Sequence, residues 1–341
     1  MNLTDSKYQQ FGLVKDMLAT VDVVASFSAD QAKETARQIA QIGRLLLTGE
    51  GSSRIFPAKN AIATARRMNW PITLHTDAAR QAQEYDLSNW AVFAASNSGK
   101  TSEVIKLFTD LRSKAHNHLF GLTAGDNSKL AELSEKCYVL SCGAEGAVAA
   151  TKSVIEQALF YQAMLEHACG IPLLARRCPQ LAHDMQTALT TPIDPKLIDA
   201  IASAGTIYFA GRNDGVAEEL ALKANEITRR KSDFLEGTYA VHGIEEVMDK
   251  SDVVIWLDPY EDALGKFHDV LAAGVGLTVI AVATRPTRFP TLIVRPSELQ
   301  SYVMMAAGWN LLVETGVKLG INLDKPVRAR KVGNEFVSTA G

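Results

Sequence analysis

The fold is decided by one stretch of the sequence, Ala91-Val92-Phe93-Ala94-Ala95-Ser96-Asn97-Ser98-Gly99-Lys100-Thr101, in which an apolar run of strand length leads directly into a hydroxyl-rich turn. The apolar periodicity then changes, because Val104, Ile105, Phe108 and Leu111 recur at the spacing of one helix face. A strand, a tight turn and a helix in this order make up part of a βαβ unit. The stretch therefore predicts a parallel sheet flanked by helices.

Short apolar runs and longer amphipathic runs continue to alternate on both sides of this stretch. We expect strands at 44–48, 72–75, 91–95, 118–122 and 137–141, and again at 206–210, 253–257, 277–282 and 292–294. The loop Gly49-Glu50-Gly51-Ser52-Ser53 after the first strand has an echo in Gly211-Arg212-Asn213-Asp214-Gly215. The pattern predicts an α/β protein with two tandem, doubly wound parallel-sheet domains, each a flavodoxin-like three-layer sandwich.

The chain length agrees with two domains, because 341 residues is about twice the usual size of one. The predicted linker contains Pro179, Pro192 and Pro195 around a short helical run. We expect N-terminal helices at 1–43, a first, phosphate-binding domain at 44–175, the linker at 176–195, a second domain with the catalytic Glu and His at 196–319, and a C-terminal tail closing the site at 320–341.

The composition excludes several classes of protein. Lys and Arg total 35 against 38 Asp and Glu, for a net charge of -3, so we expect no nucleic-acid partner and no membrane partner. No secretory signal or membrane span is evident, which predicts a cytoplasmic protein. The four cysteines lack a Cys-x-x-Cys pair and metal-ligand spacing. We therefore expect buried free thiols, no disulfide framework and no metal.

The turn after residues 91–95 predicts a binding site for a phosphate ester. It combines backbone N–H groups at a helix N-terminus with the hydroxyls of Ser96, Ser98 and Thr101 and the ammonium of Lys100. Gly-Lys-Thr also ends a Walker A loop, but the first glycine of that motif is replaced by Ala94. A further alternative is that Ser96 and Thr101 only cap the helix.

The loop after the first strand has a similar character. Ser52 and Ser53 could bond to sugar or phosphate oxygens, or could belong to a plain turn. Its Gly-x-Gly is too short for a dinucleotide fingerprint, because Arg54 stands at the sixth position. In the second half, the turn Asp258-Pro259-Tyr260-Glu261-Asp262 is acidic and should repel phosphate.

Candidate acids and bases lie in the second half. Glu226 stands one helical turn beyond Lys223, where a surface salt bridge is the alternative to a catalytic role. His242 precedes a glycine, and imidazole is the side chain best suited to moving protons near neutral pH. Lys331 lies in the tail, where composition alone suggests a solvated side chain. Spacing alone does not choose among these residues.

Taken together, these segments resemble the SIS (sugar isomerase) family over about residues 40–332. The resemblance is greatest to the isomerase half of glutamine-dependent glucosamine-6-phosphate synthase and to the stand-alone aminosugar-phosphate isomerases and deaminases. The motifs that carry it lie at 51–53, 96–101, 145–152 (Glu-Gly-Ala-Val-Ala-Ala-Thr-Lys), 221–227 (Ala-Leu-Lys-Ala-Asn-Glu-Ile), 242–243 (His-Gly) and 324–331.

The resemblance implies a role for each matching residue. Glu226 would be the base that moves a proton between C1 and C2 of an open-chain sugar, supported by Lys223. His242 would open the sugar ring from the neighbouring subunit, which implies a homodimer with composite sites. Lys331 would meet the carbonyl as an imine or polarise it. The sugar phosphate would be bound by Ser52, Ser53, Ser96, Asn97, Ser98, Thr101 and Val148.

Departures from the family pattern concern the substrate more than the reaction. Ala150 replaces a frequent Ser, Tyr239 a frequent Glu and Ile244 a frequent Pro, while Val327-Arg328 replaces Arg-Asn in the tail. Only 43 residues precede the first strand and Met1 is no cysteine nucleophile, so we expect no glutaminase domain.

The sequence therefore predicts an enzyme without cofactor, either a sugar-phosphate isomerase or an aminosugar-6-phosphate deaminase. Its substrate would be a phosphorylated hexose or aminosugar of the glucosamine-6-phosphate type. The alternatives are a fructosamine-6-phosphate deglycase and a non-catalytic sugar-phosphate sensor.

Overall fold

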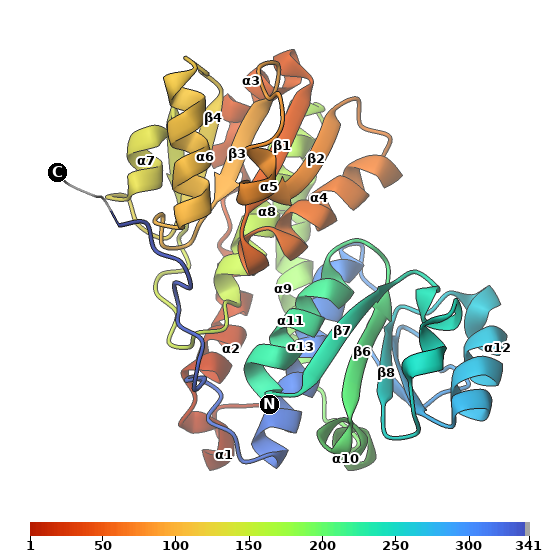
Figure 1. Ribbon diagram of the computed structural model, residues 1–341. Helices are drawn as coiled ribbons and strands as arrows, with labels where there is room; N and C mark the ends of the chain where they lie inside the picture. Colours follow the sequence, from red (N-terminus) through yellow and green to blue (C-terminus); the bar gives the residue numbers. More distant parts are fainter. Residues whose placement is uncertain (338–341) are drawn as a thin grey trace. The chain divides into compact units, whose positions relative to one another are not determined.

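A computed structural model describes residues 1–337, and its first five strands form one parallel sheet in the order β2-β1-β3-β4-β5 (Figure 1). The strands are β1 (Arg44–Gly49), β2 (Thr73–Ala78), β3 (Ala91–Ala95), β4 (Leu119–Thr123) and β5 (Lys136–Val139). The winding reverses between β1 and β3, which are hydrogen-bonded neighbours. Open parallel sheets bind their ligands at such a switch point, outside the carboxyl ends of the strands.

The next five strands repeat this topology in the order β10-β9-β8-β6-β7. They are β6 (Thr206–Gly211), β7 (Lys231–Glu236), β8 (Val253–Leu257), β9 (Thr278–Ala283) and β10 (Thr291–Ile293). Numbered from its own first strand, each sheet has the order 2-1-3-4-5, which is the flavodoxin-like order. The prediction of two doubly wound parallel sheets is therefore confirmed.

Helices connect the strands as expected. They are α1 (Ser6–Gln9), α2 (Gly12–Ala25), α3 (Lys33–Ile42), α4 (Ile55–Arg67), α5 (Ala79–Ala82), α6 (Ser102–Ser113), α7 (Lys129–Leu133), α8 (Lys152–Ala168), α9 (Leu174–Thr190), α10 (Pro195–Ser203), α11 (Val216–Thr228), α12 (Leu264–Phe267) and α13 (Gln300–Lys318). Short 3-10 turns include η2 (Gly51–Ser53), η3 (Tyr239–Val241) and η4 (Ile244–Val247), and a π-helical segment, η6 (His268–Val275), follows α12.

Two elements differ from the sequence-based expectation. Strand β7 was not expected, because its Lys231, Asp233 and Glu236 are polar and the strand lies at a sheet edge, next to β6. Most of the expected linker is the 17-residue helix α9, which tolerates Pro179 because a face that includes Leu181, Met185 and Leu189 is buried.

Contacts divide the chain into two compact units, each built from segments distant in sequence. The β1–β5 unit comprises residues 23–145 and 150–178 together with the tail from Ala329. The β6–β10 unit comprises residues 1–22, 146–149 and 179–328. The division falls inside α9, and the four-residue segment Gly146–Ala149 belongs to the β6–β10 unit although the residues around it belong to the other.

The core of the β1–β5 unit has a separate layer on each face of its sheet. On one face, α5, α6 and α7 bury a cluster that includes Leu46, Val92 and Phe108. On the other face, the β3 side chain Phe93 packs edge-on against Tyr161 of α8, with ring centroids 5.2 Å apart. Burial on both faces explains why β3 is a continuous apolar run without polar alternation.

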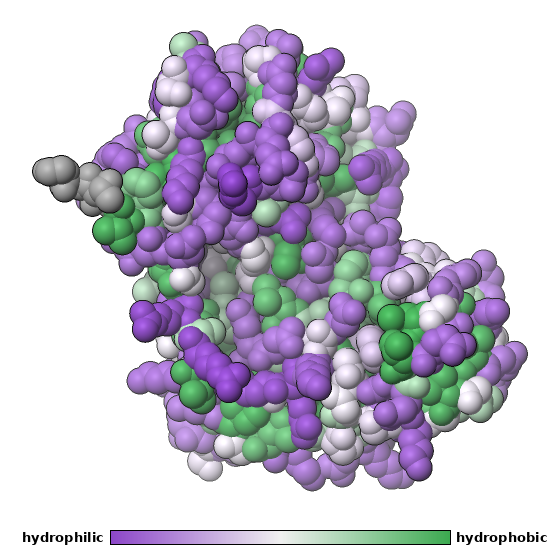
Figure 2. Space-filling view, viewed as in Figure 1, coloured by the Kyte–Doolittle hydropathy of each residue, from purple (hydrophilic) through white to green (hydrophobic). Residues whose placement is uncertain are grey.

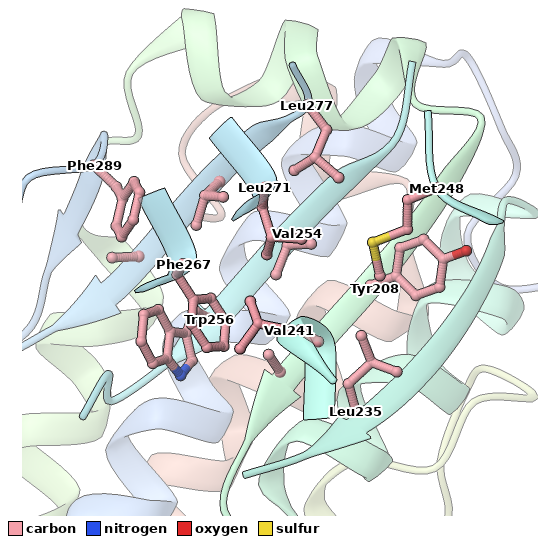
Figure 3. Packing of buried hydrophobic residues seen from close by; sticks show 14 residues of the cluster. Tyr208, Leu235, Val241, Met248, Val254, Trp256, Phe267, Leu271, Leu277 and Phe289 are labelled. Atoms are coloured by element: carbon pink, nitrogen blue, oxygen red, sulfur yellow. The ribbon is translucent and has the colours of Figure 1, made fainter. Parts of the chain in front are cut away.

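The β6–β10 unit has a cluster of its own, to which β6, β7, β8, β9, η3, α12 and η6 contribute (Figure 3). Trp256 of β8 stacks on Phe267 of α12 with ring centroids 3.6 Å apart and an interplanar angle of 12°. Leu271 of η6 and Val241 of η3 are buried in the same cluster. This packing fixes both the end of β8 and the segment that leads to His242.

The surface in view is mostly hydrophilic, with hydrophobic residues gathered over α12 and the segment after it (Figure 2). Within residues 1–337, no helix is both long and apolar enough to cross a lipid bilayer. Cys178 is buried, whereas the other three thiols are only partly buried, so the expectation of four buried thiols was correct for one of them.

Candidate active site

The hydroxyl-rich loop lies between β3 and α6, at the switch point of the first sheet. Ser96 is buried, and its Oγ lies 2.8 Å from the Oγ1 of Thr101. Thr101 occupies the N-cap position of α6, but its side chain makes no capping hydrogen bond. The two hydroxyls bond to each other, which argues against helix capping as their role.

Gly99 gives this loop its shape. Its φ is +62°, in the left-handed region that favours glycine. A Cβ at this position would lie 2.3 Å from the Cβ of Ser128, which caps α7 by accepting the Ala131 N–H at 3.2 Å. The Gly99 carbonyl also accepts the N–H of Leu130 at 3.0 Å. The loop is therefore clamped against the N-terminus of α7.

Asn97 and Ser98 belong to the same loop between β3 and α6. Asn97 directs its Nδ2 toward Glu145 at 3.4 Å, and its carbonyl accepts the N–H of Ala124 at 2.9 Å. Ser98 Oγ accepts the N–H of Lys100 at 3.2 Å. Four of the predicted phosphate-binding residues, Ser96, Asn97, Ser98 and Thr101, are thus brought together in one turn.

Ser52 and Ser53 lie in η2, immediately after β1. Because β1 and β3 are parallel neighbours, the loops after them leave from the same edge of the sheet. The backbones of β1 and β3 approach closely at their carboxyl ends, since a Cβ on Gly49 would lie 2.7 Å from the carbonyl oxygen of Ala95. This places the two serines at the same switch point as the hydroxyl-rich loop.

The tail reaches this loop as a short added strand. Thr101 and Glu335 form an antiparallel bridge, in which Asn334 O accepts the N–H of Ser102 at 3.0 Å and Phe336 N–H donates to Lys100 O at 2.8 Å. Lys100 Nζ lies 3.3 Å from the carboxylate of Glu335. The ammonium expected to meet a phosphate is therefore paired with the tail. The dark blue end of the chain passes α6 in Figure 1.

Lys331 lies in the same unit and pairs with Glu145, Nζ to Oε2, at 2.9 Å. The side chain of Glu145 is fully buried. Burial opposes its ionisation, but Lys331 and backbone hydrogen bonds from Thr151 and Ser153 outweigh it and hold the pKa of Glu145 below its usual value. The sequence places Glu145 in a family motif without indicating a role for it.

Val148 lies in the segment Gly146–Ala149, which belongs to the β6–β10 unit. Its N–H donates to the carbonyl of Asp324 at 3.1 Å. The Asp324 carboxylate in turn accepts the N–H groups of Gly12 and Leu13 at 2.9 and 2.8 Å, at the start of α2. The beginning of the tail therefore anchors the backbone of Val148.

Glu226 belongs to a row of charged residues on α11 in the β6–β10 unit. The fully buried ammonium of Lys223 lies 2.7 Å from Glu226 and 3.3 Å from Glu219. Burial lowers the pKa of Lys223, but Glu226 and then Glu219 outweigh it, so the pKa is raised overall. Glu226 keeps 24% of its side-chain surface exposed. The surface-salt-bridge alternative is wrong for Lys223, because that side chain has no exposed surface.

Glu219 was not singled out from the sequence, although a signal for it exists. Glu219, Lys223 and Glu226 succeed each other at helical spacing on a face that includes the buried Val216 and Ile227. A charged row beside apolar neighbours indicates buried ion pairs, which are costly to bury and therefore suggest function.

His242 lies in a different setting, exposed at the end of η3. The next residue, Gly243, has a φ of +107°. Two large apolar side chains nearby in sequence are also exposed, Tyr239 at 51% and Val247 at 70%. Thus the histidine belongs to an exposed, partly apolar segment, whereas Glu226 is partly buried and pairs with the fully buried Lys223.

The loops at the switch point of the second sheet are bridged by their own side chains. Arg212, after β6, pairs with the carboxylate of Asp258, after β8, at 2.6 Å. The Arg212 guanidinium lies 4.5 Å from the centre of the Tyr260 ring. Asp258 has a φ of +46°, uncommon for a residue other than glycine. The acidic turn is therefore partly neutralised by Arg212. Within residues 1–337, no three His, Cys, Asp or Glu side chains are grouped as metal ligands.

Known structures share this fold. Tagatose-6-phosphate ketose/aldose isomerase from Escherichia coli superposes with a TM-score of 0.78 and 15% identity, over 95% of this chain and 98% of that chain. The C-terminal domain of glucosamine-fructose-6-phosphate aminotransferase from Francisella tularensis gives 0.76 and 15%, over 94% and 100%. Glucosamine-6-phosphate deaminase from Thermotoga maritima gives 0.71 and 19%, over 94% and 99%.

Sequence comparison adds no assignment, because no protein-family model and no curated protein sequence matches the chain. The structural similarity spans nearly the whole chain at low identity, so it establishes architecture. The expected resemblance is confirmed at that level: this chain has the two-sheet α/β fold of the SIS phosphosugar isomerases.

Proposed function

We propose that this protein is a sugar-phosphate aldose–ketose isomerase or aminosugar-6-phosphate deaminase that acts on an open-chain hexose 6-phosphate. The observation that carries the proposal is the ion pair between Glu226 and the fully buried Lys223 at 2.7 Å. Moving a proton beside a carbonyl requires one positioned carboxylate, and a buried ammonium favours its ionised form. The partial exposure of Glu226 leaves it accessible to a substrate.

The proposed reaction is a proton transfer between neighbouring carbons. Glu226 removes a proton from the carbon beside the carbonyl, the electron pair forms the double bond of a cis-enediolate, and the carbonyl oxygen takes up the negative charge. Isomerisation is complete when a proton moves from the neighbouring hydroxyl oxygen to the former carbonyl oxygen and Glu226 returns its proton to the former carbonyl carbon. With a 2-amino sugar the same steps pass through an enolamine to an imine, which water converts to a ketose and ammonia.

The other proposed contacts agree with the same assignment. The hydroxyls of Ser96, Ser98 and Thr101, with the side chain of Asn97, would bind the 6-phosphate at the N-terminus of α6. Ser52 and Ser53, at the same switch point, would add two more hydroxyls. The backbone of Val148 would contact the sugar. Similarity to a tagatose-6-phosphate isomerase and a glucosamine-6-phosphate deaminase supports this substrate class.

We further propose a cytoplasmic homodimer without a cofactor, in which His242 opens the sugar ring of the neighbouring subunit. The exposure of His242 together with Tyr239 and Val247 supports a partner that covers this segment.

The test is to mix the purified protein with glucosamine 6-phosphate and to measure fructose 6-phosphate and ammonia together. We expect both products, and Glu226→Gln should lower kcat by about 100-fold or more. Asp199→Asn is the matched control, because Asp199 pairs with Lys318 on the surface of the same unit. Equal activity of Glu226→Gln and wild type would refute the assignment of the base.

Other outcomes would identify the alternatives. Release of an amine from glycated amino-acid phosphates, with no reaction of glucosamine 6-phosphate, would indicate a deglycase. Tight binding of sugar phosphates without turnover of any of them would indicate a sensor.

A further inference from the structure

Glu145 is a buried carboxylate that the proposed reaction does not use directly. Its side chain has no exposed surface, and it accepts the N–H of Thr151 at 2.7 Å and the hydroxyl of Ser153 at 3.1 Å. Two of its neighbours belong to the proposed site, Asn97 at 3.4 Å and Lys331 at 2.9 Å. One carboxylate therefore connects the hydroxyl-rich loop, the start of α8 and the tail.

Lys331 is also held in place by the residues after it. Three residues further along, Asn334 begins the short strand that pairs with the loop before α6. Phe336 packs against the core cluster of the β1–β5 unit. The segment from Lys331 to Phe336 is therefore held at both of its ends. The ion pair with Glu145 fixes Lys331 at its start, and the short strand fixes Asn334 to Phe336 at its end.

An ammonium in an ion pair and a free amine do different chemistry. To form an imine, the nitrogen must attack the carbonyl carbon with its lone pair, lose its protons and release water. An ammonium has no lone pair to donate, but it stabilises the negative charge that develops on a carbonyl oxygen during enolisation. Lys331 therefore has two possible roles, imine formation as a free amine and charge stabilisation as an ammonium. The ion pair with Glu145 favours the second role, because it stabilises the ammonium form.

Resting on the function proposed above, we propose that Glu145 is a positioning residue that holds Lys331 as an ammonium ion beside Asn97, so that Lys331 stabilises the substrate oxygen by its charge and forms no imine. The ion pair at 2.9 Å between the fully buried side chain of Glu145 and Lys331, whose side chain is 37% exposed, carries this inference.

The chain offers a matched control in Glu156. This carboxylate is also buried, and it accepts the N–H groups of Ser141 and Cys142 at 2.7 and 2.8 Å in the same unit. It thus braces backbone in the way that Glu145 does, but at the turn after β5. A purely structural role would make Glu145→Gln and Glu156→Gln behave alike.

The first readout is steady-state kinetics. We expect Glu145→Gln to lower kcat by about 10-fold to 100-fold with KM changed less than about threefold, as removal of an orienting partner does. Glu156→Gln should keep kcat within about twofold at a comparable loss of thermal stability. Equal kcat for the two variants would overturn the positioning role.

The second readout separates charge from imine formation. Lys331→Arg keeps a cation but cannot form the imine, so it should retain at least about tenfold more activity than Lys331→Met. Sodium borohydride added during turnover should leave no sugar on Lys331, as judged by peptide mass mapping. A reduced adduct on Lys331 of the wild type, or equal inactivity of both variants, would overturn the proposal.

A third readout does not depend on turnover. Trace acetylation should label Lys331 several-fold more slowly in the wild type and in Glu156→Gln than in Glu145→Gln. Equal labelling in all three would refute the ion pair even in a protein that turns over no sugar phosphate. Failure of the proposed function would instead be an inactive wild type whose Lys331 is still protected.

Discussion

The two sheets have the same strand order, but their switch points are filled differently. In the first, the loops after β1 and β3 present hydroxyls and a glycine with a φ of +62°. In the second, the loops after β6 and β8 are joined by the ion pair between Arg212 and Asp258 at 2.6 Å. The same topology thus supports one switch point lined by hydroxyls and another bridged by an ion pair.

This difference shows that architecture alone does not make a site. The strand order places loops at the carboxyl edge in both units, but side-chain chemistry decides whether a ligand can enter. In the β6–β10 unit, Lys223 and Glu226 lie instead on helix α11, where Lys223 and Glu219 are fully buried, whereas His242 is exposed at the end of η3. Four experiments challenge this contrast, in order of decreasing effect.

The largest effect is expected from Lys223→Met. It would leave Glu219 buried and Glu226 partly buried without their ammonium, which typically costs about 3–5 kcal/mol of unfolding free energy. Urea unfolding monitored by circular dichroism measures this loss of unfolding free energy. Lys318→Met, which removes a surface pair with Asp199, should cost less than about 1 kcal/mol. Equal losses would mean that the α11 row contributes no more than surface charge does.

A smaller loss is expected from Gly99→Ala. The new Cβ would meet Ser128 at 2.3 Å as well as straining a φ of +62°, so we expect a loss of about 2–4 kcal/mol. Gly143→Ala, with a φ of +70° and nothing within 4 Å of its Cβ, should lose only about 1–2 kcal/mol. The difference in unfolding free energy between the variants measures the clash, and a zero difference would show that the loop can move away from α7.

The contrast between the switch points is tested by titration with inorganic phosphate in a calorimeter. Ser96→Ala should weaken binding by about 10-fold, because one hydrogen bond to a charged oxygen is lost. Arg212→Gln should change the affinity by less than about twofold, because Arg212 lies in the other unit, paired with Asp258. The reverse result would assign the anion site to the second sheet.

The smallest effect concerns pH. The pKa of Glu145 is below its usual 4.5 in the folded protein, so its ionised form stabilises the fold above that value, and this contribution is lost as the pH falls through the lower, folded value. The Tm difference between wild type and Glu145→Gln should therefore be present near neutral pH and shrink in the acid range. A difference that grows on acidification would contradict the sign of the shift.

Much of the fold could be predicted because its signals are local. The apolar run 91–95, the turn and the helix after it lie within about two dozen residues, and strand and helix periodicities need no distant information. Strand β7 could not be predicted in this way, because Lys231, Asp233 and Glu236 make it resemble a loop until it pairs with β6. Its place at the sheet edge explains how it tolerates those charges.

The candidate site also has features that could be predicted from the sequence and features that could not. The hydroxyls of the β3–α6 loop and the spacing of Lys223 and Glu226 could be read in the sequence, because each set lies within a few residues. The contact between Glu145 and Lys331 could not, since 186 residues separate them. The sequence analysis expects the tail to close the site, but it does not indicate the short strand by which the tail pairs with the loop before α6, because that pairing depends on backbone hydrogen bonds that any residue can make.

By itself, the sequence determined the fold class, the duplicated topology and the chemical character of each loop, because these depend on patterns that neighbouring residues impose on one another. Only the tertiary structure decided that Lys223 is buried between two carboxylates, that Ser96 and Thr101 bond to each other, and that Glu145 holds the tail lysine. Burial and long-range pairing arise when distant segments exclude water together, and no local pattern encodes which segments will meet.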